Sequence, residues 1–100
     1  MLKIHKQAKA EEDLIDIWMY SFEQWGIVQA DQYIDRLDNS IKTIAANPDI
    51  GTACDSVRRG YRQLHVKKHY IFYRYTVDTV FIIRVLGSAM HYQPILQDKE

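Results

Sequence analysis

The chain contains little cysteine, proline or glycine: one, two and four residues, respectively, among 100. Because Cys54 has no second cysteine to pair with, an intrachain disulfide and a metal site built on several thiolates are both excluded. No apolar run approaches the roughly 20 residues that a membrane helix requires. The N-terminal residues MLKIHK also lack the apolar stretch of a secretory signal. We therefore expect a cytoplasmic protein without a membrane span.

The composition is that of an ordinary globular domain. Hydrophobic residues make up 47% of the chain, aromatic residues 12% and charged residues 26%, which supplies a core and argues against intrinsic disorder. A chain of this length is expected to form one domain over residues 1–100. The sequence has no glycine-rich phosphate loop and no nucleotide-binding fingerprint. We therefore expect neither a cofactor nor a metal site.

The formal net charge is zero, but the charges are unevenly distributed. Residues 1–57 carry ten acids against five bases, whereas residues 58–84 carry seven bases against one acid. The seven bases are Arg58, Arg59, Arg62, Lys67, Lys68, Arg74 and Arg84. This division predicts a positive face suited to phosphate or to an acidic protein partner. The alternative is two solvated faces that complement each other within the domain.

Helical periodicity covers two neighbouring segments, residues 8–24 and about 28–46. In the first, apolar residues recur at three- and four-residue steps from Ala10 to Trp25, and three acids occupy the first turn. Gly26 favours a helix end there, and Asn47-Pro48 ends the second segment. Two helices joined by so short a link are expected to lie antiparallel, as an αα-hairpin.

Beyond Val57 the β-forming residues dominate. Three runs, residues 61–66, 69–77 and 80–86, are separated by Lys67-Lys68 and Asp78-Thr79, which are short enough for antiparallel hairpins. A short strand is also expected over residues 2–6, and Pro94-Ile95-Leu96 could add an edge strand or a helical turn. In the second run, one side of the strand is expected to carry Ile71, Tyr73 and Tyr75, and the other side Tyr70, Phe72 and Arg74. In the third run, one side is expected to carry Phe81, Ile83 and Val85, and the other side Val80, Ile82, Arg84 and Leu86.

This order predicts an α+β fold in which an antiparallel helical hairpin packs on one face of an antiparallel sheet. Both faces of the sheet are substantially apolar, so the face away from the helices should meet something else. We expect that outer face to stay free for another macromolecule.

Six motifs occur in the order and spacing of one known family. They are residues 10–17, Trp25-Gly26, Asn47-Pro48-Asp49-Ile50-Gly51, Gly60-Tyr61-Arg62, Ile71-Phe72-Tyr73-Arg74 and Ile83-Arg84-Val85-Leu86. Over about residues 3–92 the chain resembles RelE/ParE-type toxins, most closely the ParE branch, whose fold has the order β-α-α-β-β-β. The resemblance implies the toxin of a type II toxin–antitoxin system, wrapped by the acidic or amphipathic C-terminal segment of a cognate antitoxin. A higher-order toxin–antitoxin oligomer is a further expectation.

For ParE-like members the implied target is DNA gyrase, which the toxin traps so that DNA breaks accumulate. For RelE-like members it is messenger RNA, which the toxin cleaves on the ribosome. RNA cleavage requires cations and proton-transfer groups around the scissile phosphate. The candidate catalytic residues are Arg62, His69, Arg74, Arg84, His91 and Tyr92. The competing interpretation, which we favour, is non-enzymatic target binding, with these arginines as ion-pair partners or antitoxin contacts.

Two sets of binding residues are expected. The target-binding candidates are Arg58, Arg59, Arg62, Lys67, Lys68, Arg74, Arg84, Met90, His91 and Tyr92. The antitoxin-binding candidates are Trp18, Phe22, Tyr33, Leu37, Tyr73 and Arg74. The chain departs from the family at two places, with Gly87 where a histidine is frequent and His91 where an aspartate is frequent. Both lie in the C-terminal stretch attributed to gyrase contact, so a toxin with weakened activity is a third hypothesis.

Overall fold

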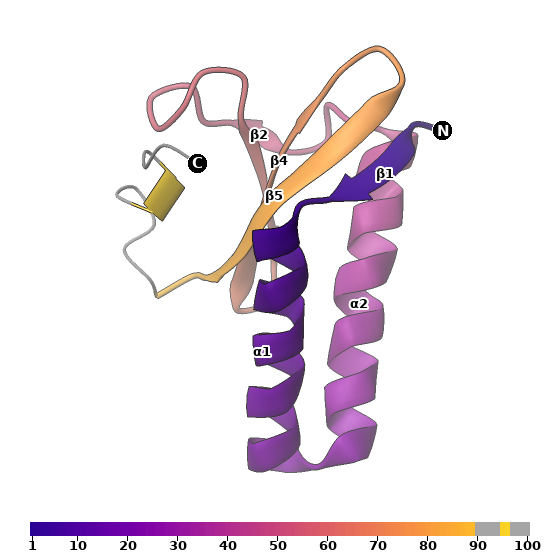
Figure 1. Cartoon of the computed structure of the whole chain (residues 1–100), viewed down its shortest axis with the longest axis vertical. Coiled ribbons are helices and arrows are strands. Elements are labelled where there is room, and N and C mark those ends of the chain that lie inside the picture. The colour runs from indigo at the N-terminus through magenta and orange to yellow at the C-terminus, as the bar shows by residue number, and fades with distance from the viewer. Residues whose placement is uncertain (90–94, 97–100) are drawn as a thin grey trace.

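The computed structural model describes residues 1–89 and 95–96 (Figure 1). Two helices, α1 (Ala8–Trp25) and α2 (Ile27–Ala46), follow the first strand, β1 (Lys3–Lys6). The remaining strands are β2 (Thr52–Ala53), β3 (Arg62–Val66), β4 (His69–Tyr75) and β5 (Thr79–Gly87). The expected α+β order is therefore confirmed, with the two-residue strand β2 added to it.

The two helices form the expected antiparallel hairpin, with Gly26 as the single residue between them. Gly26 has a φ of +90°, a conformation that side chains with a Cβ rarely adopt. Its N–H donates to the Phe22 carbonyl at 2.9 Å, and its carbonyl accepts from the Ala30 N–H at 3.1 Å. One glycine thus ends α1 and begins α2.

The five strands form one mixed sheet in the order β1-β5-β4-β3-β2. The hairpins β3–β4 and β4–β5 are antiparallel as expected, but β1 pairs with β5 in parallel, from Lys3 opposite Thr79 to Lys6 opposite Ile82. The expected C-terminal antiparallel sheet is therefore confirmed for β3, β4 and β5, and the N-terminal strand β1 joins it in parallel. Parallel pairing needs a long crossover connection, and here the helical hairpin and three strands separate β1 from β5.

The main core lies between the helices and one face of the sheet. It includes Leu37, Ile41 and Ile44 from α2 and Ile71 and Tyr73 from β4, all at most 1% exposed. At roughly 25 cal/mol per Å² of apolar surface removed from water, burial of these large side chains is the main stabilising contribution. The expected faces of β4 are confirmed for Ile71 and Tyr73 against Tyr70 and Phe72.

The face assignment of β5 is wrong after Ile83. Phe72 pairs with Arg84 and Tyr73 with Ile82, so Ile83 is an additional residue that forms a β-bulge. The bulge shifts the alternation by one: Val85 joins Val80 and Ile82 in the main core, and Leu86 joins Ile83 on the outer face.

A second apolar cluster covers part of the outer face of the sheet. Cys54, Val57 and Tyr61, from the loop between β2 and β3, pack there with Phe72 and Leu96. The Arg58 guanidinium donates to the Leu96 carbonyl at 3.2 Å. Ile95 and Leu96 are helical, so of the two alternatives expected for that segment the helical turn is the one observed. The expectation of a free outer face is therefore wrong for this region, because the chain's own loop and residues 95–96 cover it.

The helical hairpin extends beyond the sheet. In Figure 1 the end of the hairpin that carries the α1–α2 turn lies well away from the strands, whereas the other end packs against β1 and β5. Over residues 1–89 and 95–96, no helix is long and apolar enough to span a membrane.

Candidate functional site

A groove of about 730 Å³ lies between the projecting half of the helical hairpin and the β3–β4 turn. Its walls include Tyr20 and Trp25 of α1, Tyr33 of α2, and Lys67 and Lys68 of the turn. Such a groove arises because the β3–β4 turn reaches only part of the way along the hairpin. Aromatic walls with a few polar groups are typical of a binding site.

Tyr33 and His69 connect the two sides of this groove. The Tyr33 hydroxyl lies 2.6 Å from Nδ1 of His69 and 3.5 Å from the Val66 carbonyl. Burial lowers the pKa of His69, which the nearby Asp13 carboxylate opposes. Burial also raises the pKa of Tyr33, so both groups are neutral near pH 7. Which of the two groups donates in the Tyr33–His69 hydrogen bond depends on the tautomer of His69, since either ring nitrogen of a neutral imidazole can carry the proton.

The rim of the groove is mostly cationic. The Lys68 ammonium lies 5.9 Å from the centre of the Trp25 ring, and Arg36 of α2 and Lys67 line the same rim. Asp16 of α1 is the acid among the lining residues. The groove therefore combines aromatic walls with positive charge, which suits a segment that carries apolar and acidic side chains.

Five of the six antitoxin-binding candidates fall into two groups, and the sixth, Arg74, lies over Phe81 on the outer face of the sheet. Phe22 is 46% exposed and stacks on Trp18 at a ring-centre distance of 5.3 Å, and Tyr33 lines the groove, so these three can meet a partner. Leu37 and Tyr73 are 0% exposed in the main core, so neither can contact a partner on the surface. The sequence could not separate the groups, because all five sit on apolar stripes.

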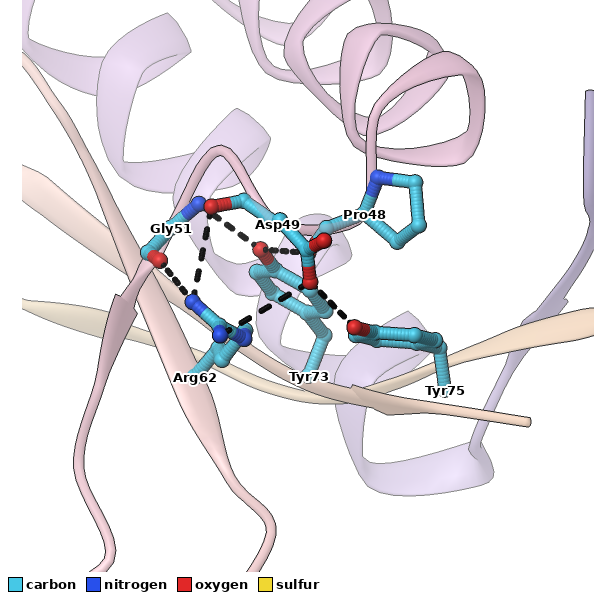
Figure 2. Close-up of polar contacts among 6 residues, drawn as sticks. All are labelled: Pro48, Asp49, Gly51, Arg62, Tyr73 and Tyr75. Atoms are coloured by element: carbon cyan, nitrogen blue, oxygen red, sulfur yellow. Dashed lines mark hydrogen bonds and ion pairs between the residues drawn. The ribbon is translucent and has the colours of Figure 1, made fainter. Parts of the chain in front are cut away.

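Arg62 belongs to a hydrogen-bonded network around the loop that follows α2 (Figure 2). Its guanidinium donates to the Gly51 carbonyl at 2.6 Å and lies 3.7 Å from the Asp49 carboxylate. The Tyr73 hydroxyl donates to the Pro48 carbonyl at 2.7 Å and accepts from the Gly51 N–H at 2.9 Å. Tyr75 donates to Asp49, which raises the pKa of Tyr75. A Cβ on Gly51 would meet the Tyr73 hydroxyl at 2.5 Å, so only glycine fits there.

The other basic candidates are dispersed. Arg84 forms a bidentate ion pair with Asp13 of α1 at 2.8 and 2.9 Å. Arg74 lies with its guanidinium carbon 4.2 Å from the centre of the Phe81 ring, on the outer face. Arg58 lies over Tyr61, and Arg59 is exposed. Arg62, His69, Arg74 and Arg84 thus have separate partners on different parts of the fold. Met90, His91 and Tyr92 lie outside the described residues.

His65 and His69 are four residues apart, a spacing that can bind a metal when it lies on a helix. Here it spans the β3–β4 turn: His65 stacks on Tyr70 and His69 bonds to Tyr33. Within the described part of the chain, no three histidine, cysteine, aspartate or glutamate side chains form a group that could hold a metal ion.

The sequence did not identify Tyr20, Trp25 and Arg36 as groove residues. Trp25 was placed on the apolar stripe of α1, but it is 53% exposed because the sheet does not reach that end of the helix. Trp25 lies edge-on to Tyr20, at a ring-centre distance of 6.1 Å. An available signal was the crowding of aromatic residues at Trp18, Tyr20, Phe22 and Trp25, in excess of what one buried stripe accommodates.

The chain is similar to known proteins in sequence and in fold. Residues 3–92 match the model of the family described as the ParE toxin of the type II toxin–antitoxin system parDE. Toxin ParE1 of Mycobacterium tuberculosis is 44% identical over 82 residues, which span 81% of this chain and 84% of the relative. Toxin ParE1 of Caulobacter vibrioides is 42% identical over 89 residues, or 89% and 90% of the two chains.

A solved structure titled as a chromosomal ParDE system from P. aeruginosa contains a chain of the same fold. The TM-score is 0.76 at 19% identity, and the match covers 87% of this chain and 96% of that one. The match to the family model covers most of the chain, and the curated relatives exceed 40% identity over more than four fifths of it. The chain therefore belongs to the ParE toxin family of type II toxin–antitoxin systems.

Proposed function

We propose that this toxin halts growth by binding and poisoning DNA gyrase, and that a cognate antitoxin prevents this by occupying the groove defined above. The observation that carries the proposal is an open groove with aromatic walls and a cationic rim, in a member of the ParE family. Gyrase is the target that the ParE resemblance implies. The action would then take place in the cytoplasm, where gyrase works.

A binding mechanism fits the basic residues better than RNA cleavage does. Arg84 and Arg62 have the carboxylates of Asp13 and Asp49 as partners, and His69 is neutral and bonded to Tyr33. A phosphorane-like transition state needs several cations directed at one point. The described catalytic candidates contact different elements and do not converge on one point, which supports inhibition by binding without a catalytic step.

The antitoxin segment would place apolar side chains against Tyr20, Trp25 and Tyr33 and acidic ones against Lys67 and Lys68. These two lysines are exposed at the tip of the β3–β4 turn. Among the described target-binding candidates, these two lysines and Arg59 are the most exposed. Met90, His91 and Tyr92 remain target-binding candidates on the sequence alone. An antitoxin that covers Lys67 and Lys68 would therefore compete directly with gyrase. Several such pairs could assemble into a higher-order complex.

Expression of the toxin alone in bacteria tests this function. We expect growth arrest with induction of the DNA-damage response, and its prevention when the neighbouring antitoxin gene is expressed as well. Arrest without DNA damage, accompanied by cut messenger RNA in a cell-free translation extract, would instead support the RNA-cleaving alternative. Harmless overexpression would favour the weakened form suggested by Gly87 and His91.

A further inference from the structure

Three side chains form a ladder across three neighbouring strands. His5 of β1 pairs with Phe81 of β5, which pairs with Arg74 of β4. The Arg74 guanidinium carbon lies 4.2 Å from the centre of the Phe81 ring, and the His5 ring meets the same ring edge-on at 5.6 Å. The phenyl ring thus holds a planar cation on the surface of the sheet.

This ladder lies on the outer face, away from the helices. Lys6 bonds to Asp38 of α2, so Lys6 faces the helical layer, and strand alternation places Lys3 and His5 on the opposite side. Phe81 packs at the margin of the outer cluster. Lys3, opposite Thr79, extends the ladder along β1, and we name Lys3, His5, Arg74 and Phe81 the outer-sheet patch.

Within the described part of the chain, the cations of the outer-sheet patch have no carboxylate partner. Among residues 1–89 and 95–96, Lys6, Arg62 and Arg84 form ion pairs, whereas Lys3 and Arg74 form none. The nearest acid in the sequence, Asp78 of the β4–β5 turn, accepts hydrogen bonds from the hydroxyls of Thr76 and Thr79. Eight of the ten acids among residues 1–57 lie on α1 and α2, the layer opposite the outer-sheet patch.

We propose that the outer-sheet patch binds the phosphodiester backbone of duplex DNA. Stacking on Phe81 fixes the guanidinium plane of Arg74 and leaves its N–H groups to donate to a phosphate in the bidentate manner that arginine favours. Arg74 covers the Phe81 ring and His5 meets it, so the ring offers no platform for a base. The contact is therefore to the backbone and independent of sequence.

The arrangement favours DNA over an acidic peptide. Strands in a sheet are about 4.8 Å apart, so Lys3 and His5 lie about 10 Å from Arg74, measured across the strands. A peptide that pairs with the free edge of β1 would run along β1 and would not reach Arg74 two strands away. A phosphate backbone that crosses the strands reaches both. Binding of this kind would hold a gyrase-bound toxin against DNA, but the proposal stands on the patch and does not need gyrase.

Fluorescence anisotropy of a labelled 20-base-pair duplex, titrated with the full chain at 50 mM salt, tests the proposal. We expect saturable binding that weakens at least about tenfold at 200 mM salt, because two or more phosphate contacts release counterions. Arg74→Glu should weaken binding about tenfold or more, and Arg74→Gln should reduce the salt slope by about one. Lys42→Glu, an equal change of charge on the exposed side of α2, is the matched control and should bind as the wild type does.

Circular dichroism of each variant verifies the fold. Absence of saturable binding at 50 mM salt, or equal weakening by Lys42→Glu and Arg74→Glu, would overturn the proposal. Displacement of the duplex by polyglutamate at the same concentration of negative charge would assign the patch to an acidic protein instead. None of these results depends on whether the toxin acts on gyrase.

Discussion

The carboxylate of Asp13 on α1 and the guanidinium of Arg84 on β5 meet in a bidentate ion pair, with oxygen–nitrogen distances of 2.8 and 2.9 Å. Asp13 also accepts the backbone N–H of Val85 at 3.0 Å, immediately after the β-bulge. Both side chains are largely buried, with exposures of 12% for Asp13 and 19% for Arg84. This contact fixes the helical hairpin to the central strand pair and so positions one side of the groove.

Replacement of Arg84 by alanine should lower the free energy of unfolding by about 2–3 kcal/mol, because it leaves the buried Asp13 carboxylate without its cation. Urea denaturation at pH 7 measures the change. Lys6→Ala breaks the more exposed Lys6–Asp38 pair and is the control, with an expected loss below about 1 kcal/mol. Equal losses in the two variants would show that the Asp13–Arg84 pair has no special structural role.

Tyr73→Phe should destabilise the fold by about 1–3 kcal/mol, since it leaves the Gly51 N–H and the Pro48 carbonyl without their buried partner. Tyr75→Phe is the matched control: it removes a hydroxyl that contacts the same loop from the same strand, but at the surface (Figure 2). We expect a clearly smaller effect for Tyr75→Phe in the same denaturation experiment. The reverse order would contradict the network as described.

Stability should fall as the pH is lowered below about 6.5, the usual pKa of an unfolded histidine. Burial lowers the pKa of His69 in the folded protein, so the unfolded chain binds more protons between the lowered and the usual value. The contribution of neutral His69 to stability is complete above about pH 6.5, and it is lost as the pH falls from there through the pKa of His69 in the folded protein. Denaturation midpoints at pH 7.5 and 5.5 measure it for the wild type and for His69→Gln. An unchanged pH dependence in His69→Gln would contradict a role for His69.

Trp25→Ala should weaken antitoxin binding at least about tenfold, because exposed tryptophans in a groove commonly dominate the binding energy. Since Trp25 is about half exposed, the fold should tolerate the change. Val77→Ala, at a residue 94% exposed in the β4–β5 turn, is the control. Calorimetric titration with a peptide of the antitoxin's C-terminal segment gives the affinities. Unaltered affinity in Trp25→Ala would place the antitoxin elsewhere on the toxin.

Much of the fold follows from local sequence patterns. The helical stripe from Ala10 onwards, Gly26 and Asn47-Pro48 predict the hairpin and its ends to within a few residues, because periodicity and backbone restrictions act locally. The β3–β4 and β4–β5 hairpins follow from short polar turns in the same way. By contrast, the bulge at Ile83 depends on packing between strands and has no clear local signal.

The candidate site was less predictable because its geometry depends on distant contacts. The basic character of Arg84 was evident, but its partner Asp13 lies 71 residues away in the sequence. Likewise, the apolar stripe of α1 does not reveal where the sheet ends, so the exposure of Trp25 and the groove beside it emerge only from the tertiary structure. Pattern alone could not distinguish buried Leu37 and Tyr73 from accessible Phe22.

The most direct test of the account is a DNA cleavage assay with purified gyrase, supercoiled plasmid and the purified toxin. We expect cleaved plasmid to accumulate with increasing toxin, and prior addition of the cognate antitoxin to prevent it. A cell-free translation reaction run in parallel should show intact messenger RNA. Unchanged supercoiling activity together with intact plasmid at saturating toxin would contradict the proposed function.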